Sequence, residues 1–254
     1  MKSFSQNFTK QDLKVIYFFN NQKNLYFIDI GANDGMTISN TFLLEKKYNW
    51  NGICSEPLPE AFNKLVKCRR AHCDNHAIFS ESNLSLNFSQ FDLLSGITEY
   101  IDCWDMAKEG EQIFVKTLTL QDLLDKYKAP KVISYFSLDT EGSELEILKS
   151  VDFSKYTFLY INLEHNFIEP RRTDIRNLLL ENGYLFKGEN NFDDDYIHES
   201  TVIGTYYFQN IFTKPITIKR INETDFSVSS TYWSDDIGTF KNGFLKFNRL
   251  GSGK

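Results

Sequence analysis

The stretch Tyr26-Phe27-Ile28-Asp29-Ile30-Gly31-Ala32-Asn33-Asp34-Gly35 decides the fold. Its first half has the aromatic and β-branched residues of a strand that is covered on both faces. Gly31 and Gly35 then allow a tight turn and a close approach to a ligand, because glycine has no Cβ. The spacing is G-x-x-x-G, and Asp29 and Asp34 add charge that would repel a pyrophosphate. The stretch therefore predicts a strand, a turn and a helix that suit a neutral or cationic ligand, such as a ribose, an amine or a sulfonium.

A second acidic strand end follows about one strand–helix–strand unit later. The short apolar run Asn51-Gly52-Ile53-Cys54-Ser55 ends in Glu56, and Pro57 stops it. An acidic residue at that place can accept hydrogen bonds from both hydroxyls of a ribose. The two strand ends together predict a nucleoside pocket without a phosphate site, a description that S-adenosylmethionine fits.

The rest of the chain alternates between strand and helix patterns. This order predicts an α/β fold, a doubly wound Rossmann-like sheet with helices on both faces, whose ligands bind at the carboxyl ends of the strands. Residues 82–101 resemble a hairpin insertion, and residues 184–250 are rich in strand patterns. We expect helices at 9–20, 37–47, 58–65, 120–127, 145–151 and 173–182, and strands at 25–30, 52–56, 76–79, 131–138 and 158–163.

Composition limits the function classes. The 254 residues are 41% hydrophobic and 24% charged, as in a globular fold. The net charge is −6 and there is no Lys/Arg block, so nucleic acid is not the expected partner. No apolar run has the length of a membrane span, and the N-terminus lacks a signal-peptide core, which predicts a cytoplasmic protein.

Four segments, FIDIGANDG, GICSEP, FSLDTEGSELEILKS and INLEH, resemble the FkbM family of S-adenosylmethionine-dependent methyltransferases. The resemblance covers roughly residues 25–200, and D-x-E-G-x-E after the fourth strand is its most specific part. It implies a seven-stranded methyltransferase sheet with an antiparallel last strand. It also implies O-methylation of a hydroxyl, commonly on a sugar, a glycolipid or a polyketide-like product.

The resemblance also assigns the cofactor-binding residues by position. It implies that Asp29, Gly31 and Asn33 line the methionine end of S-adenosylmethionine, with Asp34 and Gly35 in the same turn. Glu56 would hold the ribose. The segment Asn75-His76, at the expected third strand, would lie near the adenine.

The reacting hydroxyl needs a base or a metal ion, because a sugar hydroxyl is a poor nucleophile until it loses its proton. Acidic residues follow the fourth and fifth strands, and neighbouring parallel strands bring their ends together. One hypothesis places Mg²⁺ or Mn²⁺ on Asp139, Glu164 and His165, since oxygen ligands suit such ions. The other makes His165 a general base that Asp139 or Glu141 orients. A third interpretation gives these groups only a structural role.

We expect two parts in the chain. Residues 1–212 form the methyltransferase domain, and residues 213–254 form a β-rich extension packed on it. The extension would cover the sheet edge, complete the pocket for a small-molecule or carbohydrate acceptor, or build a homodimer contact. Rival functions on the same fold are methylation of a non-sugar molecule, a nicotinamide-dependent oxidoreductase and a non-catalytic binding module.

Three weaker patterns favour structural roles. Residues 193–195 with His198 predict a solvated acidic loop rather than a polyol or metal site. The aromatic residues Trp104, Tyr232 and Trp233 could stack on a sugar, but packing is the simpler interpretation. Cys68, His72, Cys73 and His76 lack the spacing of a zinc site, so we expect reduced thiols.

Overall fold

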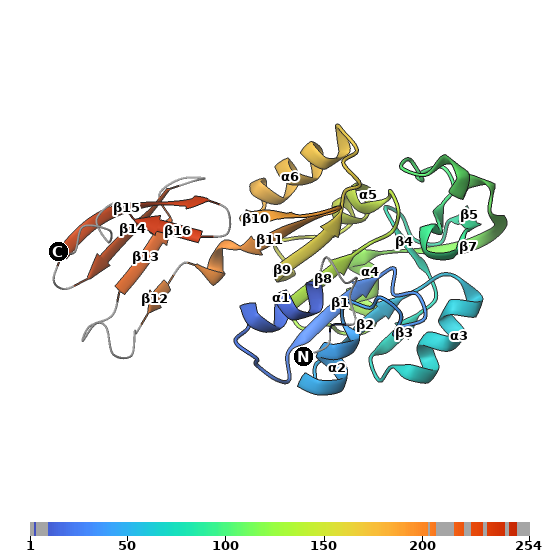
Figure 1. The fold of residues 1–254 in the computed structure, drawn as a ribbon, viewed down its shortest axis with the longest axis horizontal. Coiled ribbons are helices and arrows are strands. Elements are labelled where there is room, and N and C mark those ends of the chain that lie inside the picture. Colours follow the sequence, from blue (N-terminus) through green and yellow to red (C-terminus); the bar gives the residue numbers. More distant parts are fainter. Residues whose placement is uncertain are drawn as a thin grey trace.

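A seven-stranded mixed sheet forms the centre of the molecule (Figure 1). The computed structural model describes residues 3, 10–202, 204–206, 216–220, 225–230, 233–241 and 244–247. The strand order is β10-β11-β9-β8-β1-β2-β3, and β11 runs antiparallel to β9. This is the doubly wound sheet with an antiparallel strand that the sequence predicts. The strands are β1 (Tyr26–Ile30), β2 (Asn51–Ser55), β3 (His72–Asp74), β8 (Val132–Leu138), β9 (Thr157–Glu164), β10 (Tyr184–Asn190) and β11 (Asp193–His198).

Helices cover both faces of this sheet. One hydrophobic cluster joins Ile28 and Phe136 to α4 (Leu120–Lys126), α5 (Glu144–Lys149) and α6 (Arg171–Glu181). The other joins Phe27 and Tyr135 to α1 (Gln11–Phe18), α2 (Phe42–Tyr48) and α3 (Pro59–Cys68). Neighbouring residues of a strand point to opposite faces, so both faces of each central strand are apolar.

The two best-marked helix ends follow the sequence signals. The Thr119 hydroxyl accepts a hydrogen bond from Asp122 N at 3.0 Å and caps α4. Gly183, with φ of +83°, follows the end of α6 in the left-handed conformation that favours glycine. Within the described residues, no helix is long and apolar enough to cross a membrane.

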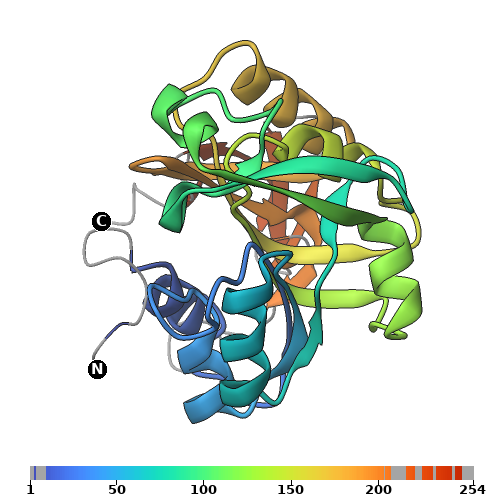
Figure 2. The same ribbon diagram turned by 90° about the vertical axis from the view of Figure 1, so that its right-hand side faces the viewer.

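A four-stranded sheet, in the order β4-β7-β5-β6, is inserted between β3 and α4 (Figure 2). It contains β4 (Ala77–Phe79), β5 (Ser85–Gln90), β6 (Gly96–Ile97) and β7 (Glu111–Thr119), with the 3₁₀ turns η1 (Asp92–Leu94) and η2 (Asp105–Glu109). The expected hairpin insertion is therefore present, and it continues past residue 101 to the long strand β7.

The strand expected at 76–79 is present, but its expected place as the third strand of the central sheet is wrong. The third strand of the central sheet is β3, and Ala77–Phe79 forms β4, which pairs with β7 in the inserted sheet. The chain leaves the central sheet between them, where Asp74 Oδ1 accepts a hydrogen bond from His76 N at 3.1 Å. Both strands are only three residues long. Such short segments show no hydrophobic periodicity that could tell which of them belongs to the central sheet.

The expected acidic loop at 193–195 is also wrong. These residues open β11, and Asp193, Asp194 and Asp195 are all buried. Buried carboxylates need partners, and the fold supplies them: Gln11 donates to Asp193 at 2.6 Å, and Asn162 to Asp195 at 3.0 Å. These partners are distant in sequence.

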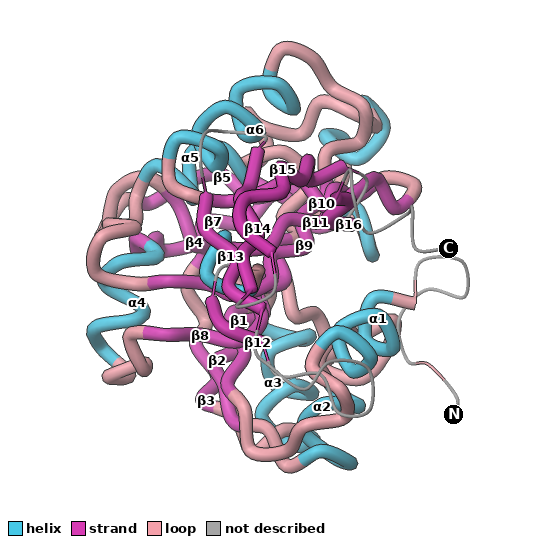
Figure 3. The backbone as a smooth tube through the Cα atoms, turned by 90° about the vertical axis from the view of Figure 1, so that its left-hand side faces the viewer, coloured by secondary structure: helices cyan, strands magenta, loops and turns pink. Residues whose placement is uncertain are grey.

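The C-terminal part is a second antiparallel sheet, in the order β12-β13-β14-β15-β16 (Figure 3). Its strands are β12 (Gly204–Tyr206), β13 (Ile216–Arg220), β14 (Asp225–Ser230), β15 (Trp233–Lys241) and β16 (Phe244–Phe247). Its first strand precedes residue 212, where we expected the domain boundary. Ile218 is buried against the cluster that contains Val15 and Leu185. Tyr232 lies outside the described residues.

Candidate active site

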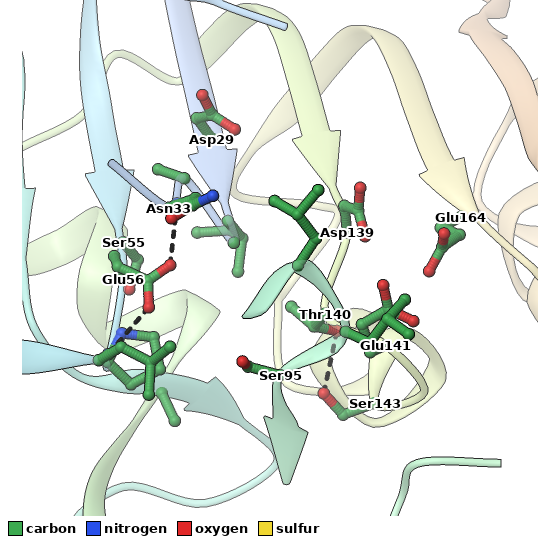
Figure 4. Close-up of a pocket in the computed structure, with 18 of the residues that line it drawn as sticks. Asp29, Asn33, Ser55, Glu56, Ser95, Asp139, Thr140, Glu141, Ser143 and Glu164 are labelled. Carbon is green, nitrogen blue, oxygen red and sulfur yellow. Dashed lines mark hydrogen bonds between the residues drawn. The ribbon is translucent and has the colours of Figure 1, made fainter. Parts of the chain in front are cut away.

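A cavity of about 290 Å³ opens at the carboxyl ends of β2, β1, β8 and β9 (Figure 4). The inserted sheet forms its other wall. Among the described residues, the lining contains no Lys or Arg and six acidic residues, namely Asp29, Glu56, Asp92, Asp139, Glu141 and Glu164. Such a lining favours a cationic ligand and disfavours a phosphate.

The glycine turn after β1 ties three strands together. Gly31 N and Ala32 N both donate to Ser55 O, at 3.1 and 3.0 Å. Gly31 has φ of +84°, and a Cβ there would lie 1.8 Å from Asp139 O. Only glycine fits between β1 and β8 at this point. Gly31 and Asn33 line the cavity.

Asp34 and Gly35 do not line the cavity. The Asp34 carboxylate accepts hydrogen bonds from Met36 N and Thr37 N, at 2.9 and 2.7 Å, and organises the turn. Gly35 has φ of +79°, and a Cβ there would lie 2.5 Å from the Leu65 side chain. Both residues shape the turn rather than contact the cavity.

Glu56 is held by two backbone groups at the end of β2. Its Oε2 accepts a hydrogen bond from Asn33 N and its Oε1 one from Leu58 N, both at 2.8 Å. Burial raises its pKa to about 7, although these hydrogen bonds oppose the shift. Each carboxylate oxygen keeps a second lone pair for a ligand hydroxyl.

Asp29 forms the other acidic corner of the same end. It is 4% exposed, and the Thr41 hydroxyl donates to it. Burial raises its pKa, while the nearby Arg69 guanidinium acts in the opposite direction. Arg69 is itself paired with Glu45 at 2.9 Å, so Asp29 is left without a full counter-charge beside the cavity.

Of the two residues expected near an adenine, only His76 lines the cavity. Its Nδ1 lies 2.6 Å from Asp74 Oδ1, which fixes the ring. Asn75 is exposed and outside the lining, because the chain turns there from β3 toward β4.

Three carboxyl groups meet where β8 and β9 end. Asp139, Glu141 and Glu164 each offer an oxygen within 4.8 Å of the others, and we call them the carboxyl triad. Burial raises the pKa of all three, and repulsion by neighbouring carboxylates, with Glu144 among them in each case, raises it further, while the Glu164 side chain acts in the opposite direction on Asp139. Glu164 Oε2 has no hydrogen-bond partner within the described part of the chain. The triad is therefore suited to hold a proton or a cation.

Glu144, the last acid of D-x-E-G-x-E, builds the turn that presents Glu141. Its Oε1 accepts hydrogen bonds from Thr140 N and Gly142 N, both at 3.1 Å. Glu141 adopts φ of +59°, an uncommon conformation for a residue with a side chain. The motif D-x-E-G-x-E contains Glu144, but the sequence pattern assigns it no role.

His165 does not join Asp139 and Glu164. It is fully buried, its Nδ1 accepts a hydrogen bond from Phe167 N at 2.9 Å, and its Nε2 lies 3.4 Å from Asp194 Oδ1. Asp194 also binds Arg172 and Arg176, at 2.7 and 2.8 Å. The group of neighbouring carboxyl oxygens therefore contains Glu141 and not His165. His165 does not line the cavity, and its role as ligand or base stays a prediction.

Burial raises the pKa of Asp194, but the adjacent His165 ring and the hydrogen bonds from Arg172 and Arg176 outweigh burial and leave the pKa well below its usual range. A second possible metal group, His165, Glu189 and Asp194, is thus already neutralised by two arginines. A divalent cation beside them would be repelled.

The topology and the acidic cavity define a Rossmann-like methyltransferase. Residues 29–186 match the model of a protein family that is described as "Methyltransferase FkbM domain". This match covers more than half of the sequence, so the chain belongs to the FkbM family of methyltransferases. A comparison with curated proteins gave no match.

Solved structures with similar folds are distant in sequence. Methyltransferase FkbM from Methylobacillus flagellatus KT is 12% identical, with a TM-score of 0.45 over 77% of this chain and 56% of that one. A putative RNA methyltransferase from Pyrococcus horikoshii is 12% identical, with a TM-score of 0.42 over 78% and 92%. The plantazolicin methyltransferase BpumL in complex with SAH is 10% identical, with a TM-score of 0.34 over 80% and 70%. This chain therefore spans little more than half of the first of these proteins.

Proposed function

We propose that the protein transfers a methyl group from S-adenosylmethionine to a hydroxyl group, most simply that of a sugar or glycoconjugate precursor. One observation carries the proposal: a single cavity joins the glycine turn and Glu56 to the carboxyl triad. The first part suits a nucleoside with a positive charge, and the second suits an acceptor that must lose a proton.

The cofactor end fits S-adenosylmethionine by its donor and acceptor chemistry. The sulfonium and the amino group are cationic, and the lining, as far as the structure describes the chain, offers acids without Lys or Arg. Glu56 has lone pairs for the two ribose hydroxyls, since each oxygen accepts only one backbone hydrogen bond. The bound cofactor supplies an electrophilic methyl group.

The carboxyl triad supplies the proton acceptor. Transfer would form the bond from the hydroxyl oxygen to the methyl carbon while the bond from that carbon to the sulfonium sulfur breaks and leaves a thioether. The hydroxyl proton would pass to a triad carboxylate. The raised pKa values of Asp139 and Glu141 make their ionised forms stronger bases than ordinary carboxylates. Asn166 Nδ2 lies 3.5 Å from Glu141 Oε2 and orients that side chain.

The triad also fits Mg²⁺ or Mn²⁺. The mutual repulsion of three carboxylates and the unpartnered Glu164 Oε2 are features that a divalent cation would relieve. Asp139, Glu141 and Glu164 would hold the ion, which would lower the pKa of the acceptor hydroxyl. The proposal therefore has two forms. In the metal-free form a triad carboxylate accepts the proton, and in the metal-dependent form an ion on the triad lowers the pKa of the acceptor hydroxyl.

The test is transfer of a labelled methyl group to a panel of sugars, nucleotide-linked sugars and non-sugar alcohols, analysed by mass spectrometry. The proposal expects methylated sugar and loss of transfer in Glu141→Gln. Methylated product from non-sugar alcohols alone would show that the acceptor is not a sugar. Cofactor binding without any product would favour a binding module, and reduction of a nicotinamide would favour the oxidoreductase.

Treatment with a chelator distinguishes the metal-free form of the mechanism from the metal-dependent form. Chelation should abolish transfer if the triad needs a metal, and Mg²⁺ or Mn²⁺ should restore it. Thermal unfolding offers a readout without turnover, because an ion bound to the triad raises Tm in the wild type and not in Glu164→Gln. Full activity in chelator, with no shift of Tm, would leave the metal-free base.

A further inference from the structure

The cavity has two ends with different chemistry. Asp29, Glu56 and His76 line the end at β1 and β2. Asn166 and Phe192 line the other end, beyond β8 and β9. Figure 4 shows the carboxyl triad on that second side, away from Glu56. The second end is therefore where an acceptor can reach the triad.

The inserted sheet is fastened to this second end. Arg171 forms an ion pair with Asp102, and its Nη1 also donates to Gly142 O at 3.0 Å. A Cβ on Gly142 would lie 2.0 Å from Tyr100 O. Residues 100–102 thus touch the turn that carries Glu141, and Trp104 follows two residues later.

Three large apolar side chains are exposed in the cavity lining. Leu93, Trp104 and Phe192 all line the cavity, and they are 47%, 43% and 40% exposed. Phe167 is 51% exposed and packs edge-on against Phe192, with ring centroids 5.8 Å apart. Exposed apolar side chains in a cavity lining favour an apolar ligand, because binding removes their surface from water. The carboxyl triad in the same lining, by contrast, is acidic.

We propose that the acceptor is amphiphilic: it carries an alkyl or aryl group next to the reacting hydroxyl, and Leu93, Trp104 and Phe192 bind that group. The hydroxylated part reaches the triad while the apolar part contacts these three side chains. This inference rests on the proposed function and makes these three residues the determinants of acceptor specificity. Free, fully polar sugars would leave these side chains exposed and should be poor ligands.

The experiment uses matched methyl, phenyl and octyl glycosides of a set of hexoses and deoxyhexoses, with octyl glycosides kept below the micelle concentration. Their binding to the protein saturated with S-adenosylhomocysteine is measured by calorimetry. We expect the octyl or phenyl member to bind about tenfold more tightly than the methyl member, which is the effect of roughly two buried methylenes. The alkyl and aryl arms distinguish the two kinds of apolar group.

Trp104→Ala should remove most of this gain while leaving the affinity for S-adenosylhomocysteine unchanged, which also shows that the variant is folded. Phe114→Ala is the matched control, because Phe114 is 78% exposed on β7 and outside the cavity lining. Equal affinities for all three glycosides, equal effects of the two variants, or no binding of any probe would overturn the inference.

Methyl transfer to the same probes is scored separately. Tight, Trp104-dependent binding without transfer would count against the proposed function while the proposed binding of the apolar group stands. Transfer that does not depend on the apolar group of the probe would support the proposed function and contradict the proposed binding of that group by Leu93, Trp104 and Phe192.

Discussion

At the scale of single residues, the cavity depends on acids that the fold buries and holds with backbone hydrogen bonds. Glu56 and Glu144 each accept two backbone hydrogen bonds. Such contacts fix the carboxyl group without neutralising it. The cost of burying these charges is relieved when a cationic ligand binds, so affinity and protonation should be linked.

Glu56 gives the first prediction. Its pKa of about 7 means that it loses part of its charge below neutral pH, and only the ionised form accepts both ribose hydroxyls. Affinity for S-adenosylhomocysteine should therefore fall as the pH decreases from 8 to 6. Glu56→Gln should weaken binding by about 1.5–3 kcal/mol, the contribution of hydrogen bonds to a charged group. It should also flatten the pH dependence, and calorimetry at several pH values measures both effects. An unchanged affinity in a folded variant would remove Glu56 from the site.

His165 gives the second prediction. Because its ring contacts Phe167 N and Asp194, it braces the turn that carries Asn166 and Glu164. His165→Asn should lower the free energy of unfolding by about 1–3 kcal/mol, the penalty for unpaired buried polar groups. The shape of the pH–rate profile should not change. His198→Asn, at a ring that contacts Ser200 outside the cavity, is the control. Loss of the rising limb of the pH–rate profile in His165→Asn would instead identify His165 as the base.

The sequence predicts which residues lie at the edge of the sheet, but it does not predict the direction of the His165 side chain. Strand ends placed Asp29, Glu56, Asp139 and Glu164 at one edge, and the structure has them there. Side chains alternate along a strand, so Glu164, the last residue of β9, and His165 after it point to different sides. The positive φ values of Glu141 and Asn166 depend on tertiary contacts that no local pattern encodes. The roles of these residues in binding and catalysis stay predictions.

At the scale of elements, long apolar strands were predictable and short or charged ones were not. β1, β8 and β9 are covered on both faces, which their sequences require. β3 and β4 have three residues each, and β11 opens with three aspartates that need Gln11, Asn162 and two arginines from other elements. Such partners become visible only after folding.

Asp193 at the start of β11 gives the third prediction. Burial and the charges of Asp139 and Asp195 raise its pKa from 3.8 to about 8. Between these values the folded state binds more protons than the unfolded state, so this group makes stability fall as the pH rises through that range. The slope is at most about 1.4 kcal/mol per pH unit. Asp193→Asn, which keeps an oxygen for Gln11, should lose less stability than the wild type between pH 5 and 8. Thermal unfolding at both pH values tests this, and identical slopes would contradict it.

At the scale of the whole molecule, the site and the C-terminal sheet are separate parts of one chain. Within the described residues, no residue after Phe192 lines the cavity. The sheet nevertheless contacts the methyltransferase sheet, since β15 lies against β10 and Ile218 packs in the cluster with Val15 and Leu185. The boundary between the two parts stays a prediction, and the order of the sheets places β12 already in the second part.

Truncation after Val202 gives the last prediction. It removes β12–β16 and uncovers the surface that Ile218 buries. Burial of the Ile218 side chain contributes about 1.5–3 kcal/mol to the free energy of unfolding. Tm should fall by roughly 3–10 °C, while the affinity for S-adenosylhomocysteine stays within the error of calorimetry, because the cofactor end of the cavity lies on β1 and β2. Ile218→Ala in the full chain is the matched control and should reproduce part of the loss in Tm. Full stability of the truncated protein would show that the second sheet only adjoins the first. Loss of cofactor affinity would show that the sheet supports the site, and loss of acceptor turnover alone would assign it to the acceptor.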